Sequence, residues 1–269
     1  MTVLVIASKR DVAAQNIAKE MIRRNNFKPV PGTSDMLRQS NVFLKFVESD
    51  GIFTDRLDLP VEKVDSVIFA SRHRSESGDP TLTVHWPGNS SSRAEFGGKP
   101  KSLSFTEPAR LRSAMLTLDK ARAGHGLDYV VSLEATHHGP TELGVPTLFV
   151  EIGSTEQQWN DPLAALAASE AVWTAATAPI PGVPAVGFGG GHYCSKQSAS
   201  LRADGYAFSH IFSKYFFDEY DEEIVSMAFE RTLGEKCHTA VVDWKGIRGP
   251  ERRRLIATLT RMNVEIVRV

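Results

Sequence analysis

Short apolar segments of strand length alternate with longer helix-like segments along most of this chain, and this alternation limits the fold more than any other feature. Residues 3–7 and 42–47 are typical strand-like segments, and residues 11–22 place their apolar side chains on one helical face. Such alternation is typical of α/β proteins, whose strands are connected by helices, so we predict an α/β fold. The expected strands are 3–7, 42–47, 64–70, 81–86, 128–133, 147–152, 183–188, 238–242 and 264–269, and the expected helices are 11–22, 108–118, one starting at Asp161-Pro162, 221–233 and 252–259.

Length, composition and charge exclude several classes of protein. The chain has 269 residues, 42% of them hydrophobic and 23% charged, which is ordinary for a globular protein with a sizeable core. The formal net charge is −1. A general basic surface is therefore excluded, and any binding of nucleic acid must use a local patch.

Cysteine content and hydropathy indicate a soluble cytoplasmic protein without a membrane segment. Cys194 and Cys237 are the only cysteines, so neither a disulfide framework nor a Cys-rich zinc module is expected. The apolar N-terminus is short and has no basic leader, which favours a first buried strand over a signal peptide. The least charged stretch, residues 163–191, contains Glu170 and three prolines, so it is not expected to be a transmembrane helix.

Three of the expected strands end in clusters of polar residues. They are followed by residues 134–140 (EATHHGP), residues 151–155 (EIGST) and residues 189–193 (GGGHY). Ligands bind beyond the carboxyl ends of strands in open α/β sheets, and consecutive strands are usually neighbours. We therefore expect these clusters to meet at the C-terminal edge of one central sheet. The side chains expected to converge there are Glu134, His137, His138, Glu151 and His192.

The residue types in these clusters suit a metal-dependent catalyst. Imidazole and carboxylate groups are preferred zinc ligands, and three protein ligands plus a water make a catalytic zinc site. Glu134, His137 and His138 are candidates for those ligands, with a fourth from Glu151 or His192. The alternative is structural, because a His-His pair before Gly-Pro also suits a loop held by hydrogen bonds.

Two further segments have the chemistry to bind phosphate. The run Gly189, Gly190 and Gly191 allows close approach of the backbone to a ligand, although it lacks the P-loop and dinucleotide signatures and also suits a flexible turn. Arg72, His73 and Arg74 follow an expected strand, and His85 lies on the polar side of the next one. The alternative for these residues is a solvated loop and an exposed strand residue.

At these clusters the chain resembles the D-aminoacyl-tRNA deacylases of the archaeal and plant type. The matching segments are 71–75, 82–89, 132–140, 149–155 with Trp159, and 187–193, and the most specific is 134–140. The chain departs from the family pattern after Tyr193, where Cys194-Ser195 replaces an expected Ala-Pro. Because the match extends over nearly the whole chain, we expect residues 1–269 to form a single domain.

This resemblance implies a fold, a reaction and a set of site residues. The implied fold is a three-layer α/β/α arrangement with a mixed sheet, similar to the phosphorylase and peptidyl-tRNA hydrolase group. The implied reaction is zinc-dependent hydrolysis of the ester of D-aminoacyl-tRNA, which releases free D-amino acid and tRNA, by a monomer or small homo-oligomer. The candidate catalytic residues are Glu134, Thr136, His137, His138 and Glu151; the candidate substrate-binding residues are Arg72, His73, Arg74, His85, Gly189, Gly190 and Gly191; and the candidate zinc ligands are Glu134, His137, His138 and His192.

Three other functions share some of these features. A zinc-dependent peptidase or amidase would have the same site and a different substrate. A metal-free enzyme that binds phosphate or nucleotides would use the glycine run with Arg72 and Arg74. A non-catalytic RNA-binding module is disfavoured by the net charge of −1 and by the lack of interleaved aromatic and basic motifs.

Overall fold

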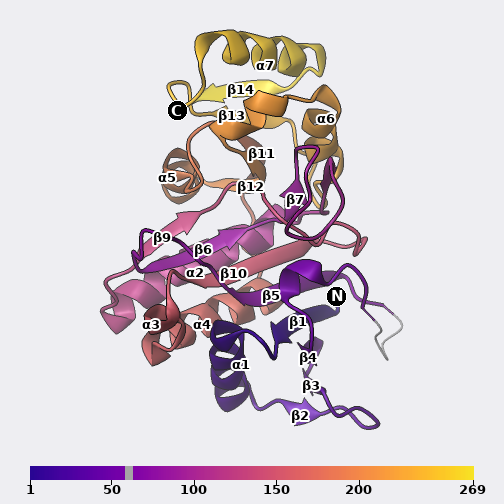
Figure 1. The fold of residues 1–269 in the computed structure, drawn as a ribbon, viewed down its shortest axis with the longest axis vertical. Coiled ribbons are helices and arrows are strands. Elements are labelled where there is room, and N and C mark those ends of the chain that lie inside the picture. Colours follow the sequence, from indigo (N-terminus) through magenta and orange to yellow (C-terminus); the bar gives the residue numbers. More distant parts are fainter. Residues whose placement is uncertain (58–62) are drawn as a thin grey trace.

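The computed structural model describes residues 1–57 and 63–269, which form two large β-sheets with helices packed against them and a separate two-stranded sheet of β7 and β8 (Figure 1). The larger sheet has the strand order β2-β3-β4-β1-β5-β10-β6-β9, and the smaller sheet has the order β12-β11-β13-β14. The strands are β1 Val3–Ser8, β2 Lys28–Pro29, β3 Met36–Gln39, β4 Val42–Val47, β5 Ser66–Arg72, β6 Thr81–His85, β7 Gly88–Asn89, β8 Ser102–Leu103, β9 Val130–Leu133, β10 Thr147–Gly153, β11 Val183–Phe188, β12 Tyr206–Phe212, β13 Thr239–Val242 and β14 Glu265–Arg268. The helices are α1 Val12–Asn25, α2 Pro108–His125, α3 Glu156–Trp159, α4 Pro162–Thr177, α5 Ser195–Ala203, α6 Glu222–Glu230 and α7 Gly249–Arg261, with 3-10 helices η1 Gly51–Phe53 and η2 Lys214–Glu219.

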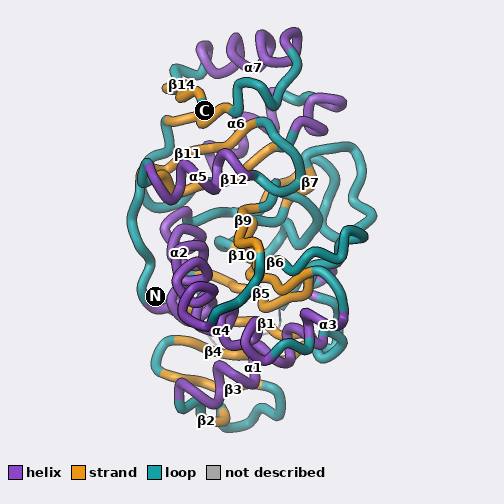
Figure 2. Tube along the Cα trace, turned by 90° about the vertical axis from the view of Figure 1, so that its left-hand side faces the viewer, coloured by secondary structure: helices purple, strands orange, loops and turns teal. Residues whose placement is uncertain are grey.

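The two faces of the larger sheet are covered differently. Helices α1, α2 and α4 pack against one face, where Leu82 and Val84 of β6 join an apolar core. Figure 2 shows α2 beside α4, and the same helix also contacts β12 of the smaller sheet. On the opposite face, Phe69 of β5 and Phe149 of β10 stack with ring centroids 4.6 Å apart. That second face becomes polar toward β6 and β9, where the candidate site lies.

The smaller sheet has apolar cores on both of its faces, which gives it an α/β/α layering. Ala185 and Val241 face the core shared with α2 and α5, whereas Val186 and Val242 face a core built with α6 and α7. All of its strand pairs are parallel, while the larger sheet mixes parallel and antiparallel pairs. The prediction of an α/β fold with a mixed sheet is confirmed. The expectation of one central sheet is wrong, because β11 begins a second sheet.

Local signals placed several elements correctly. Asp161 caps α4 before Pro162, as predicted. The helix expected from residue 11 begins at Val12, and Asp11 caps it by accepting a hydrogen bond from the amide of Ala14 at 3.0 Å. Strand β12 and helix α5 were not predicted. Helix α6 ends at Glu230, short of the expected Leu233. Among the described residues, no helix is long and apolar enough to cross a membrane.

Candidate active site

The candidate site lies on the polar face of the larger sheet. Alternation along β6 directs Thr81, Thr83 and His85 to this face, opposite the apolar Leu82 and Val84. All three polar side chains are buried, and His85 is fully buried. The alternative interpretation, in which His85 is an exposed strand residue, is therefore wrong. The polar side of this strand faces a second protein interior, closed by the loops of the smaller sheet.

Strand direction explains why the site lies on a face and not at an edge. Strands β5 and β10 run one way, whereas β6 and β9 run the opposite way, so their carboxyl ends point to opposite edges of the sheet. Glu151 lies within β10, opposite Thr83 of β6 and Ser71 of β5. The expectation of a site at the C-terminal edge is wrong for this reason. Strands β9 and β10 are also separated by β6, so they are not neighbours.

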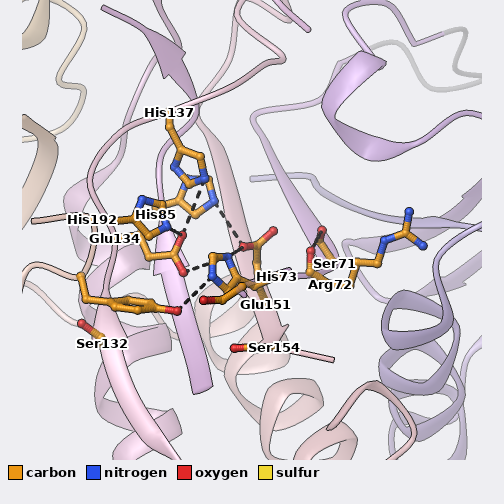
Figure 3. A network of polar contacts seen from close by, with 12 residues as sticks. Ser71, Arg72, His73, His85, Ser132, Glu134, His137, Glu151, Ser154 and His192 are labelled. Carbon is orange, nitrogen blue, oxygen red and sulfur yellow. Dashed lines mark hydrogen bonds and ion pairs between the residues drawn. The ribbon is translucent and has the colours of Figure 1, made fainter. Parts of the chain in front are cut away.

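Glu134 lies at the centre of a cluster of histidines (Figure 3). Its carboxylate oxygens lie 3.1 Å from Nε2 of His192, 3.3 Å from Nδ1 of His73 and 3.7 Å from Nε2 of His137. Glu151 lies 3.6 Å from Nδ1 of His73 and 3.6 Å from Nε2 of His85. The structure thus brings together candidate residues from five separate segments of the chain. His192 reaches the cluster from the loop after β11, across the junction between the two sheets.

His137 and His138 are both held with Nδ1 against the backbone. Nδ1 of His137 donates to the carbonyl oxygen of Ala135 at 2.8 Å, and Nδ1 of His138 donates to that of Gly139 at 2.6 Å. This pairing leaves the Nε2 lone pair of each ring free to bind a metal ion or a proton. The two rings lie 4.4 Å apart, and the ring of His137 lies 4.3 Å from that of His85.

Several groups of these side chains have the spacing of metal ligands. His85, His137 and His138 form one group, and His73, Glu134 and His192 form another; within each group the ligand atoms lie within 4.8 Å of one another. A third group, His85 with Glu134 and Glu151, overlaps both. The four predicted zinc ligands are therefore divided between two groups. His73 and His85, expected to bind substrate, lie among them.

Buried polar atoms without partners test whether a metal ion suits this cluster. Both ring nitrogens of His85 and both carboxylate oxygens of Glu134 are buried, and none makes a well-aligned hydrogen bond among the described residues, although Glu134 forms ion pairs with His192 and His73. Unsatisfied buried polar atoms are costly, so they indicate a missing partner. Imidazole nitrogens and carboxylate oxygens are together the donor set that zinc prefers. These residues fit a zinc ion.

Electrostatics divides the cluster into charged and neutral groups. Burial opposes the charge on Glu134, but His192, His73 and His85 outweigh it and lower the pKa of this carboxyl to about 2. Glu151, paired with His73 and His85, also has a pKa below the usual range. Against the effect of burial, Glu151 and Glu134 raise the pKa of His73 to about 9. The site therefore contains two ionised carboxylates.

His137 and His138 behave in the opposite way. Burial, together with the nearby His85, lowers the pKa of His137 well below its ordinary value and that of His138 to about 4. Both imidazoles are consequently neutral near pH 7, which is the form that binds a metal ion.

Arg72 and Arg74 lie beside the cluster and pack on one indole ring. Their guanidinium carbons lie 5.6 Å and 5.4 Å from the ring of Trp159, whose Nε1 donates to the carbonyl oxygen of His73. The side chain of Arg72 also donates to the carbonyl oxygen of Arg10 and lies 3.6 Å from Asp50. Arg74 is exposed. Of the two predicted phosphate ligands, Arg74 is thus the more available.

Gly189, Gly190 and Gly191 do not contribute equally. The amide of Gly189 donates to the carbonyl oxygen of Phe212 at 2.7 Å, so it is not available to a ligand. Gly190 and Gly191 line a surface pocket of about 630 Å³ next to His192. Gly189 and Gly190 have positive φ angles of 93° and 83°, which favour glycine.

The predicted catalytic residue Thr136 lies outside the histidine cluster, whereas Tyr193, which was not predicted, contacts it. The hydroxyl of Thr136 bonds with Nδ1 of His210 at 3.0 Å and accepts from the amide of Ile211, so it links the two sheets and is not aimed at the histidine cluster. Tyr193, absent from the predicted site, places its hydroxyl 3.1 Å from Nε2 of His73. The signal for Tyr193 was its position directly after His192 in the GGGHY segment. The interior that encloses Tyr193 is formed by both large sheets, and the sequence alone does not show how these sheets are arranged.

Comparison with known proteins identifies the family. A family model described as D-aminoacyl-tRNA deacylase matches residues 60–267. This chain belongs to the D-aminoacyl-tRNA deacylase family. A relative with that name from Methanosarcina acetivorans is 36% identical, and the match covers 99% of this chain and 92% of the relative. One from Thermococcus onnurineus is 33% identical, covering 98% and 99% of the two chains.

The fold of this deacylase family member matches a solved structure over nearly its full length. A crystal structure described as a conserved protein of unknown function, AF0625, superposes with a TM-score of 0.91 at 29% sequence identity. The match covers 99% of this chain and 95% of the other. Both sheets therefore belong to the fold that the two proteins share.

Proposed function

We propose that this protein hydrolyses the ester bond of D-aminoacyl-tRNA, releasing free D-amino acid and tRNA. Family membership over nearly the whole chain supports this reaction. The observation that carries it is the buried cluster of Glu134, Glu151 and histidines, which combines ionised carboxylates with neutral imidazoles in one site. Its role would be chiral proofreading, with L-aminoacyl-tRNA spared. Because charged tRNA is used in the cytoplasm, we place the protein there.

We further propose that zinc is the cofactor. His85, His137 and His138 would hold one ion, and His73, Glu134 and His192 have the spacing to hold another. A bound zinc ion would lower the pKa of a water molecule and polarise the ester carbonyl. Against the effect of burial, Glu151 raises the pKa of His85, so this ring would have to lose a proton in order to hold a metal ion.

Different residues of the chain would then have separate roles in the hydrolysis. Glu134, ionised and central, would accept the proton of the attacking water. Glu151 would hold His73 and His85 in place through its two contacts of 3.6 Å. The amides of Gly190 and Gly191, which form no hydrogen bond within the described residues, would stabilise negative charge on the carbonyl oxygen. Arg74 would contact a phosphate of the tRNA.

The decisive experiment measures release of amino acid from charged tRNA. The purified protein is given D-tyrosyl-tRNA and L-tyrosyl-tRNA in parallel, before and after treatment with EDTA, and after addition of zinc. We expect hydrolysis of the D-form only, its loss with EDTA and its return with zinc. Hydrolysis that survives complete removal of metal would reject the cofactor and keep the reaction. Cleavage of small peptides without cleavage of D-tyrosyl-tRNA would favour the peptidase or amidase alternative.

A further inference from the structure

An exposed aromatic side chain lies beside the candidate active site without a structural role. Tyr215, in η2, is 62% exposed, whereas the neighbouring Phe216 and Phe217 are buried in the core of the smaller sheet. The ring lines two adjoining hollows, of about 630 Å³ and 370 Å³. Tyrosine combines an apolar ring with a polar hydroxyl and is enriched at interfaces, so a tyrosine that lines two hollows is suited to a binding surface.

The backbone connects this tyrosine to the catalytic cluster. The amide of Lys214 donates to the carbonyl oxygen of Gly190 at 2.9 Å, and Gly190 precedes His192 by two residues. The larger hollow is lined by Gly190 and Gly191 as well as by Tyr215. A ligand lying in this hollow would contact the glycine run that directly precedes His192.

The larger hollow is lined by three cations and two carboxylates, whereas the smaller one has more carboxylates than cations. Nζ of Lys214 lies 5.2 Å from the ring centroid of Tyr215, and Lys245 lines the same hollow. Both lysines are exposed, and neither forms an ion pair among the described residues. Arg248, the third cation of the hollow, is already paired with Asp218 and Glu251. Lys214 and Lys245 are thus the available partners for an anion.

We propose that this surface, formed by Gly190, Gly191, Lys214, Tyr215 and Lys245, binds the unpaired 3′ end of the tRNA. A base would stack on Tyr215, and the lysines would contact its phosphates, because single-stranded RNA is bound by aromatic rings combined with cations. The inference rests on the proposed function, since it is the aminoacylated 3′ end that must enter the cluster. The single-stranded RNA would then lie on the smaller sheet, on the side of His192.

The first test distinguishes binding of the RNA 3′ end from hydrolysis of the ester. Tyr215→Ala should raise KM for D-tyrosyl-tRNA by about 10-fold or more, as expected for loss of one stacked base, with little change in kcat. Tyr215→Phe keeps the ring and should behave as the wild type. D-tyrosyl-adenosine, which lacks the upstream nucleotides, should be hydrolysed equally by the wild type and Tyr215→Ala. An unchanged KM for D-tyrosyl-tRNA in Tyr215→Ala would overturn the proposal.

The second test needs no catalysis and therefore distinguishes the two proposals. Affinity is measured by fluorescence anisotropy for an RNA hairpin with four unpaired 3′ nucleotides and for the same hairpin without them. The wild type should prefer the first about 10-fold, and Tyr215→Ala should lose the preference. Equal affinity of the wild type for both hairpins would reject this inference, whereas failure to release D-tyrosine from its tRNA would reject the proposed function.

A double variant tests the lysines in the same assay. Lys214→Ala with Lys245→Ala should lower the slope of log affinity against log salt by about 0.7 for each phosphate that the protein no longer neutralises. Lys120→Ala, an exposed lysine of α2 that lies outside this hollow, is the matched control and should leave the slope unchanged. An unchanged slope in the double variant would show that the two lysines do not contact the RNA.

Discussion

The two faces of β6 and β10 are equally buried and chemically opposite. On one face, Leu82 and Val150 pack among the residues of α1, α2 and α4. On the other, Thr83 and Glu151 lie opposite each other in the ladder, beside a cluster of histidines. Burial of the first face gains hydrophobic free energy, whereas burial of the second leaves polar atoms without partners. At β6 and β10, therefore, one face of the sheet stabilises the fold and the other holds the reactive groups in a buried site.

The largest expected effect is on the polar face. His137→Ala combined with His138→Ala should lower turnover of D-tyrosyl-tRNA by about 1000-fold or more, because two imidazoles with available Nε2 atoms are lost. The thermal unfolding midpoint should stay close to that of the wild type, and zinc content should fall. Turnover, calorimetry and metal analysis check this. Near-normal turnover in the folded double variant would show that the pair only holds the loop.

Glu134→Gln removes one negative charge from the polar face while keeping the shape of the side chain. If Glu134 accepts the proton of the attacking water, kcat should fall roughly 100- to 1000-fold. His85, His137 and His138 are untouched, so zinc bound by that group should remain. The measurement is kcat together with bound zinc per chain. A loss of all zinc in step with activity would instead make Glu134 primarily a ligand.

Adjacent substitutions on β6 test the two faces directly. Leu82→Ala should lower the free energy of unfolding by about 3 kcal/mol, because it leaves a cavity under the helices. Thr83→Val should change the free energy of unfolding by less than about 1 kcal/mol, since its buried hydroxyl has no protein partner to lose. Urea denaturation of both variants measures the difference. A large loss of stability in Thr83→Val would mean that the polar face also supports the fold.

The smallest expected effect lies at the rim of the polar face. Arg74→Ala should weaken tRNA binding modestly and lower the salt slope by about 0.7 to 0.9, as expected when one phosphate is no longer neutralised. Arg253→Ala, an exposed arginine of α7, is the control and should leave binding unchanged. The check is affinity for uncharged tRNA at several salt concentrations. Identical slopes for both variants would exclude Arg74 from the RNA interface.

Much of the fold was predictable because its signals are local. Residues 42–47 and 183–188 form strands with the predicted bounds, and Asp161 caps α4 as its position before Pro162 suggests. Residues 206–212 were missed because His210 interrupts the apolar run of β12. In the structure, that histidine is buried and bonded to Thr136 and to the carbonyl oxygen of Ser104.

The sequence predicted that these candidate residues lie close together, but it did not predict how their strands are arranged. The polar residues after strands 130–133 and 183–188 do meet, since His192 contacts Glu134. Their chain positions did not reveal that β6 lies between β9 and β10, or that β11 belongs to another sheet. Strand order and direction depend on contacts between distant parts of the chain, which local periodicity does not record. For the same reason, alternation along β6 does not show whether its polar side faces solvent or a buried site.

The junction between the two sheets is made by main-chain bonds. The amide of Ala135 donates to the carbonyl oxygen of His192 at 2.9 Å, that of Cys194 to Leu133 at 2.9 Å, and that of Thr136 to Ile211 at 2.7 Å. Such bonds are independent of side-chain identity, except at proline. The frame that sets Glu134 against His192 would therefore survive replacement of either side chain. A descendant of this protein is free to exchange its reactive groups, and so to acquire a different chemistry, without first rebuilding the scaffold that positions them.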